Sequence, residues 1–245
     1  MRLTRVYIDA PLGIGLQAEL PEHAGAHLVR VLRLREGDAC ILFNGDGHDY
    51  DARIIGIGKR GVQAEIVAAR RIDNESPLSI TLLQGIARGE KMDLILQKTT
   101  ELGVARIIPV HSERSEVKLE GARAIKRLAH WRGVVASACE QSGRTVLPQV
   151  DEPLPLLQAV ANAGLPAARY LLSPLADSGI DSMTAPPDDR LLIAVGPEGG
   201  WSDRDLQTLD NAGFTGIRLG PRILRTETAG LAAIAALQMR LGDLG

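Results

Sequence analysis

The chain has 245 residues, a length that allows one large domain or two modest ones. Hydrophobic residues make up 45% and charged residues 24%, an ordinary globular composition, so a sizeable core is expected. The formal net charge of −2 and an aromatic content of 3% argue against a simple electrostatic nucleic-acid binder and against RNA contacts that depend on base stacking, although they leave room for a local basic patch.

Residues 1–72 are expected to form a small β-barrel with one helix. The segment TRVYID at 4–9 alternates apolar and polar residues, and residues 38–69 hold three apolar runs separated by turn signals at NGDG and GKRG. The segment 21–34 has a helical period, with one apolar stripe formed by Ala24, His27, Leu28, Val31 and Leu32.

The segment GIGKRG at 56–61 matches the spacing of a dinucleotide-binding fingerprint. That motif requires a helix after its last glycine, because the helix N-terminus holds the pyrophosphate. Here the next residues, VQAEIV at 62–67, alternate as a strand does. We therefore interpret GKRG as a hairpin turn and reject a dinucleotide site.

The polar segment RRIDNESP at 70–77 is interpreted as a linker to a second part, residues 76–245. There, continuous apolar runs expected to be buried strands alternate with helical segments, which indicates an α/β domain with a parallel sheet. The expected strands are 78–86, 104–110, 169–175 and 191–196, and the expected helices are 90–103 and about 120–141.

The loop Gly196-Pro197-Glu198-Gly199-Gly200 follows a buried strand directly. Ligands of open α/β sheets bind at the carboxyl ends of strands, and glycines allow the main chain to approach them closely. Ser202 is expected to cap the next helix, with Asp205 three residues later. A purely structural strand-to-helix turn is the alternative interpretation of these glycines.

A second tight turn, Gly220-Pro221, follows a short strand expected at 216–219. Thr226 is expected to cap the last helix, with Glu227 in its first turn. From Ala229 to Met239 this helix is nearly all apolar, which suits either a core helix or a homodimer interface.

Arg222 and Arg225 flank two apolar residues beside this turn. Arginine side chains there suit a phosphate or the carbonyl-rich edge of a base. The alternative is that they form salt bridges, for example to Glu198 or Glu227.

Several uncommon motifs now occur together and in order: HLVRVLRLREGD at 27–38, QKTTELGVARIIPVHSERS at 97–115, ACEQSGRTVLPQV at 138–150, GPEGGWS at 196–202 and LGPRILRTETA at 219–229. Over nearly its whole length the chain resembles the RsmE family of 16S ribosomal RNA uridine-N3 methyltransferases, in the SPOUT superfamily. It departs from the family at Arg5-Val6-Tyr7, where members often have Arg followed by two Phe, and at Trp201, where Phe is common.

The resemblance implies a PUA-like β-barrel RNA-binding domain over residues 1–72 and an α/β SPOUT methyltransferase domain over 76–245, with a trefoil knot near the C-terminus. It implies a homodimer whose partner is 16S ribosomal RNA or the assembled small ribosomal subunit. It also implies S-adenosyl-L-methionine as cofactor, held by Leu172, Ser173, Gly196, Pro197, Glu198, Gly199, Leu219, Gly220, Ile223, Leu224, Arg225 and Thr228.

In the implied reaction, uridine N3 loses its proton and attacks the methyl group, while negative charge develops on the flanking carbonyls. A cation beside them would stabilise that charge, and Arg225 is the first candidate, with Arg222 second. Glu227 is a candidate base, although a capping or arginine-orienting role suits it equally. No metal is expected, because neither the chemistry nor any ligand cluster calls for one.

The candidate RNA contacts are Arg5, Arg30, Arg33, Arg114 and Arg144, with His111 as a weaker one. The basic stretch 106–144 also suits a solvated helix face, which is the usual meaning of such charges. Two alternatives for function are a SPOUT methyltransferase that acts on another RNA position and a non-catalytic ribosome-assembly binder.

The cellular setting is expected to be the cytoplasm. The first ten residues lack the apolar core of a signal peptide, and the longest apolar run, near 229–237, is too short to span a bilayer, so no membrane partner is expected. Cys40 and Cys139 lie far apart and are interpreted as small apolar side chains in a reducing compartment.

Overall fold

The computed structural model describes residues 3–58, 61–162 and 164–245. Residues 59–60 of the expected GKRG turn lie outside this range, but the strands on either side pair up to Gly58 and Gly61, as a hairpin requires. No helix in the described part of the chain combines the length and the apolar character needed to cross a membrane.

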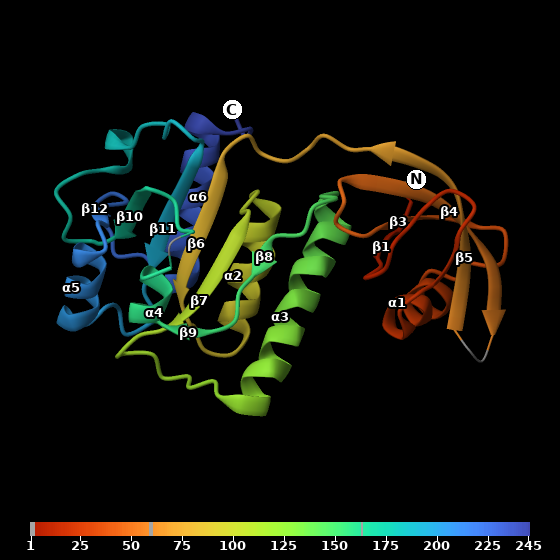
Figure 1. The fold of residues 1–245 in the computed structure, drawn as a ribbon, viewed down its shortest axis with the longest axis horizontal. Coiled ribbons are helices and arrows are strands. Elements are labelled where there is room, and N and C mark those ends of the chain that lie inside the picture. The colour runs from red at the N-terminus through yellow and green to blue at the C-terminus, as the bar shows by residue number, and fades with distance from the viewer. Residues whose placement is uncertain (1–2, 59–60, 163) are drawn as a thin grey trace. The chain divides into compact units, whose positions relative to one another are not determined.

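The chain forms two compact units, shown as a ribbon in Figure 1. The first comprises the residues up to Glu75 together with Ala136–Leu147, and the second comprises Ser76–Val135 and Pro148–Gly245. Helix α3 (Gly121–Ser142) therefore starts in the second unit and ends in the first.

The first unit is built on a sheet with the strand order β1-β3-β4-β5-β2. Its strands are β1 (Arg5–Tyr7), β2 (Gln17–Glu19), β3 (Ala39–Phe43), β4 (His48–Gly58) and β5 (Gly61–Arg71). The alternating strands predicted from the sequence are confirmed, and GKRG joins two of them rather than a strand and a helix. Among the described residues, strand pairing does not join β1 to β2, so the expected barrel is not closed by hydrogen bonds.

The helical stretch of this unit differs from the prediction. It consists of α1 (Glu22–Ala26) followed at once by a π-helical turn, η1 (His27–Val31). A π turn holds more residues than an α turn, which rotates the following side chains about the helix axis. Leu28 is fully buried, but Val31 and Leu32 are 64% and 41% exposed, so the predicted stripe is wrong at its C-terminal end.

The second unit contains a sheet with the order β12-β10-β11-β6-β7-β8, in which β9 also pairs with β7 and all pairings among the described residues are parallel. This confirms the predicted α/β domain. Its strands are β6 (Ser79–Gly85), β7 (Arg106–His111), β8 (Gln149–Val150), β9 (Leu154–Pro155), β10 (Ala168–Leu172), β11 (Arg190–Val195) and β12 (Thr215–Ile217).

Helices cover both faces of this sheet (Figure 1). They are α2 (Glu90–Glu101), α3, α4 (Leu156–Val160), α5 (Asp203–Asn211), α6 (Thr226–Leu241) and the short 3₁₀ turn η2 (Ile180–Ser182). Leu82 packs in the core with α2, α3 and α6, whereas its neighbour Leu83 packs with α4 and α5. Side chains of a strand alternate between faces, so a strand covered on both sides becomes a continuous apolar run.

Candidate functional site

A cavity of about 570 Å³ lies at one edge of the parallel sheet, where β10, β11 and β12 end. Parallel strands bring their carboxyl ends to the same edge, so the loops after these three strands surround one space. Residues 172–175, 195–201 and 217–229 supply most of the lining, and Lys91 from the start of α2 completes it. The volume falls in the range of roughly 300–1,000 Å³ that is typical of small-molecule sites.

The loop after β11 is packed directly against the end of β6. A Cβ atom built on Gly85 would lie 2.5 Å from both Pro197 N and Pro197 Cδ. Only glycine allows this approach, because real Cβ atoms do not come so near to main-chain atoms. Gly85 therefore fixes where the 196–200 loop begins.

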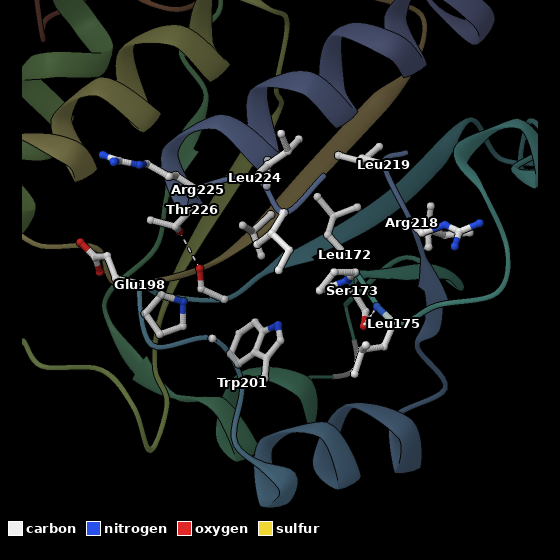
Figure 2. Close-up of a pocket in the computed structure, with 18 of the residues that line it drawn as sticks. Leu172, Ser173, Leu175, Glu198, Trp201, Arg218, Leu219, Leu224, Arg225 and Thr226 are labelled. Atoms are coloured by element: carbon white, nitrogen blue, oxygen red, sulfur yellow. Dashed lines mark hydrogen bonds between the residues drawn. The ribbon is translucent and has the colours of Figure 1, made fainter. Parts of the chain in front are cut away.

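The same loop is tied to the start of α6. The Thr226 hydroxyl donates a 2.6 Å hydrogen bond to the Gly196 carbonyl (Figure 2). It also accepts a 3.0 Å hydrogen bond from Gln84 Nε2. Thr226 is thus the first residue of α6 rather than its predicted cap, and the N-cap position is occupied by Arg225 without a side-chain capping bond. The difference results from a tertiary contact, since the Thr226 hydroxyl donates to a carbonyl of a neighbouring loop and does not cap its own helix.

The far end of the loop has the predicted capping box. Ser202 accepts a hydrogen bond from the Asp205 N–H, and the Asp205 carboxylate accepts one from the Ser202 N–H. This confirms the prediction for α5, and it anchors Trp201 immediately before the helix. In Figure 2 the Trp201 ring lies on the opposite side of the hollow from Leu224 and Leu172.

The charged groups at the cavity are arranged differently from the alternative considered above. The Lys91 ammonium lies 3.2 Å from Glu198 Oε1 and 3.9 Å from Glu227 Oε2. Neither Arg222 nor Arg225 is in a salt bridge with these carboxylates in the described part of the chain, and both side chains are exposed. Figure 2 shows Arg225 extending away from the hollow and Arg218 at its opposite end.

Glu198 is held as a carboxylate by its surroundings. Burial alone would raise its pKa, but the hydrogen bond from the Arg88 N–H, 3.1 Å long, and the Lys91 ammonium outweigh that effect and lower the pKa below its ordinary value. The loop therefore presents a fixed negative charge to the cavity at neutral pH.

The residues that line the cavity include most of the predicted set. Of the predicted cofactor and catalytic residues, those that line it are Leu172, Ser173, Gly196, Pro197, Glu198, Leu219, Gly220, Arg222, Ile223, Leu224, Arg225 and Glu227.

Two predicted residues lie elsewhere. Gly199 faces Arg114, whose Cβ would be 3.0 Å from a Cβ at this glycine, and Thr228 is exposed in the first turn of α6. The residues missed by sequence reasoning are Lys91, Pro174, Leu175, Val195, Gly200, Trp201, Leu206, Ile217, Arg218, Thr226 and Ala229. The rule that strand ends share an edge would have found those that follow β10 and β12.

Arg5 and Arg144 were predicted to contact RNA, and their burial corrects this. The Arg5 guanidinium is paired with Asp49 at 2.6 Å, donates to the Cys139 carbonyl and lies 4.5 Å from the Phe43 ring centroid. Arg144 is paired with Glu75 at 2.5 Å. Their side chains are 4% and 8% exposed, so these cations hold the first unit together.

The other predicted RNA contacts remain available to solvent. Arg30, Arg33 and Arg114 are exposed, and Arg114 Nη1 donates a 3.2 Å hydrogen bond to the Gly199 carbonyl. This bond connects one candidate RNA contact to the cavity loop. No group of three or more His, Cys, Asp or Glu side chains is placed to hold a metal ion within the described ranges.

Comparison with known proteins identifies the two units. A family model described as an RNA methyltransferase domain matches residues 74–238, and one described as an RNA methyltransferase PUA domain matches residues 20–67. The ribosomal RNA small subunit methyltransferase E of Buchnera aphidicola subsp. Schizaphis graminum is 36% identical over 99% of this chain and 98% of its own length.

Solved structures agree with this match. A methyltransferase from Legionella pneumophila in complex with the cofactor SAM has 37% identity and a TM-score of 0.93, and the ribosomal RNA small subunit methyltransferase E of Neisseria gonorrhoeae, bound to S-adenosyl methionine, has 41% identity and a TM-score of 0.89. Both alignments cover 100% of each chain. The chain therefore belongs to the RsmE family of ribosomal RNA small subunit methyltransferases, with an RNA methyltransferase domain and a PUA domain.

Proposed function

We propose that this protein methylates N3 of a specific uridine in 16S ribosomal RNA of the small ribosomal subunit, with S-adenosyl-L-methionine as methyl donor. Family membership supports the enzyme class and the RNA substrate. The observation that carries the proposal is the cavity itself. It lies between the loops after β10, β11 and β12, and most of the predicted cofactor residues line it.

The lining suits this donor in shape and charge. Apolar side chains, among them Leu172, Leu224 and Trp201, form walls on opposite sides that can enclose a flat base (Figure 2). Glu198 and Glu227 supply negative charge that can face a sulfonium cation. The buried Trp201 Nε1 has no hydrogen-bond partner in the described structure, which leaves a donor for a ligand acceptor. We propose that Gly199 and Thr228 support the site from outside the cavity.

When bound, S-adenosyl-L-methionine supplies a methyl group on a positively charged sulfur, and the electron pair of the carbon–sulfur bond stays with sulfur. The residues of the chain must manage the other half of the reaction. The N3–H electron pair of uridine becomes the new N–C bond, so the proton has to pass to an acceptor. We assign that role to Glu227 and assign the stabilisation of the carbonyl charge to Arg225, assisted by Arg222.

RNA is proposed to be held by the exposed Arg30, Arg33 and Arg114, whose guanidinium groups can pair with phosphates. We keep residues 1–72 as the RNA-binding domain and 76–245 as the catalytic domain. The substrate also supports a cytoplasmic location.

A trefoil knot and a homodimer complete the proposal. The knot is supported by two contacts with the β10–β11 connection: Gly179 bridges Arg218 before α6, and Arg240 at the end of α6 donates to the carbonyls of Ile180 and Asp181. The homodimer is supported by Leu175 and Ile223, two apolar residues of the cavity lining that are 90% and 82% exposed.

Nucleoside mass spectrometry tests the function. Ribosomal RNA from a strain that lacks the gene should have lost N3-methyluridine, and the purified protein with S-adenosyl-L-methionine should restore it on small subunits from that strain. An unchanged level of N3-methyluridine in the deletion strain would rule the proposal out, and a different lost nucleoside would identify the true target.

A further inference from the structure

Lys91 is the one cavity residue from the β6–α2 segment, and the mechanism above gives it no role. It occupies the first turn of α2, directly after the tight turn at Gly89, whose φ is 55°. A cation in the first turn of a helix is opposed by the helix dipole. Its Nζ is close to both Glu198 and Glu227, but a side chain that is 38% exposed forms ion pairs of little value for folding. Stability therefore does not explain the residue.

Three elements meet at this ammonium group. Glu198 comes from the loop after β11, Glu227 comes from the first turn of α6, and Lys91 comes from α2. An ammonium group has three N–H donors, so one can bind Glu198 at 3.2 Å while another is directed to Glu227 at 3.9 Å. Arg88, the nearest other cation on this segment, is instead paired with Glu116 at 2.7 Å.

The two carboxylates are not held alike. Glu198 Oε1 also accepts the Arg88 N–H, so its position is fixed twice. Glu227 Oε2 is buried and accepts no hydrogen bond within the described structure, and Lys91 is the cation near it. A buried acceptor without a hydrogen-bond partner is unfavourable, so the position of the Glu227 carboxylate depends on the nearby Lys91 ammonium group. With Oε2 3.9 Å from Lys91 Nζ, Oε1 is the oxygen of Glu227 that remains to meet a substrate.

We infer that Lys91 is a positioning residue for methyl transfer, whose ammonium group holds the Glu227 carboxylate against Glu198 so that Glu227 Oε1 faces the uridine N3 proton. The inference rests on the proposed function. It assigns the proton step to one oxygen: the N3–H bond breaks, its proton passes to Oε1 and then to water, and its electron pair stays on N3 to form the bond to the methyl carbon. Glu198 remains unprotonated throughout.

The test compares Lys91→Met with Lys98→Met, which removes a lysine from the same helix. Lys98 is paired with Glu101 and does not line the cavity, so it is a matched control. Each full-length variant is assayed for methyl transfer to small subunits, for calorimetric affinity for S-adenosyl-L-methionine and for thermal unfolding. Lys91→Met should lower kcat roughly 10- to 100-fold, the scale of one misplaced proton acceptor, and change the affinity less than about threefold. Lys98→Met should match the wild type.

A double-mutant cycle shows whether Lys91 acts through Glu227. If it does, adding Lys91→Met to Glu227→Gln should cause little further loss. Lys91→Gln is made in parallel, as a second neutral variant, in case the methionine variant unfolds. Lys91→Arg, which keeps the charge, should recover part of the rate.

Three results would overturn the inference: a wild-type kcat in the neutral variants, a loss of cofactor affinity as large as the loss of kcat, or independent, multiplying effects of Lys91 and Glu227. Failure of the proposed function is distinguishable, because the wild-type protein would then produce no N3-methyluridine at all.

Discussion

The substitution Gly85→Ala is expected to weaken cofactor binding, although Gly85 does not line the cavity. A Cβ at this position would lie 2.5 Å from Pro197 N and Cδ and 3.0 Å from Gly196 C. Carbon atoms in contact prefer separations of about 3.5–4.0 Å, so the 196–200 loop would have to retreat by about 1 Å. Overpacking of this kind costs about 1–3 kcal/mol.

The retreat also has a defined effect on the neighbouring contacts. It would stretch the 2.6 Å bond from Thr226 to the Gly196 carbonyl beyond hydrogen-bond range. If the cofactor binds only when the 196–200 loop is in its wild-type position, binding to Gly85→Ala must include the free energy of moving the loop back. The affinity is lowered by that amount. A cost of about 1–3 kcal/mol corresponds to a roughly 5- to 150-fold weaker Kd for S-adenosyl-L-methionine.

Isothermal titration calorimetry and urea unfolding measure the two effects. The control is Gly133→Ala in the middle of α3, where a Cβ would meet no atom within 4 Å. Replacing glycine by alanine inside a helix should stabilise the protein by roughly 0.5–1 kcal/mol and leave the Kd unchanged. Wild-type affinity in Gly85→Ala would show that the loop is not held by this contact, and the reasoning would fail.

Two substitutions and one labelling experiment have outcomes that follow directly from the structure. Thr226→Val should lower the free energy of unfolding by about 1–3 kcal/mol, because the Gly196 carbonyl loses its buried donor; an unchanged urea midpoint would argue against this. Ser202→Ala removes the capping box with Asp205 and should cost about 0.5–2 kcal/mol in the same assay, whereas no loss would mean that the cap is dispensable. Burial raises the pKa of the Cys139 thiol from 9.0 to about 12, so alkylation at pH 8, followed by peptide mapping, should leave it unmodified in the folded protein. The folded state favours the thiol, so this contribution to stability is complete below pH 9 and is lost as the pH rises toward 12; rapid labelling at pH 8 would contradict the burial.

Hydrophobic periodicity predicted helices and strands well where the pattern of a regular element holds throughout the segment. Strands β6, β7 and β11 of the second unit are buried on both faces, and continuous apolar runs indicated them, whereas the short β8 and β9 were not predicted. The helix at 21–34 was predicted less well, because a π turn changes the residues per turn and no 3.6-residue pattern can anticipate that. The capping prediction worked for Ser202, whose partners are local, and failed for Thr226, whose partner is the Gly196 carbonyl.

Charges were harder to place than elements. Arg5 was interpreted as a surface cation, but its partner Asp49 lies on β4, which is separated from β1 by β3 in the sheet. Nothing local in the sequence shows that a carboxylate lies there. A basic residue near a chain end is usually solvated. The burial of Arg5 could be predicted only if the strand order were known.

The strand order also determines which charged residues meet at the cavity. The sequence analysis kept salt bridges from Arg222 and Arg225 to Glu198 or Glu227 as an alternative to a substrate-binding role. In the structure β6 lies beside β11, which brings Lys91, far away in sequence, between those carboxylates. Lys91 is thus the cation that the salt bridges of the described residues place beside both carboxylates.

Arg222 and Arg225 belong to the cavity lining but are exposed, and the Arg225 side chain is directed away from the hollow (Figure 2). Glu198 and Glu227 place negative charge beside Lys91 in the lining, and the exposed Arg222 and Arg225 place positive charge toward solvent. A cationic donor and a polyanionic substrate have opposite requirements, and this separation of charge meets both within one site. If Lys91 is what keeps the carboxylates from the arginines, then Lys91→Met should bring Arg225 toward Glu227, and RNA binding should weaken even in the absence of cofactor. Unchanged RNA affinity in that variant, measured by filter binding at fixed salt, would show that the arginines are separated from the carboxylates by the backbone alone.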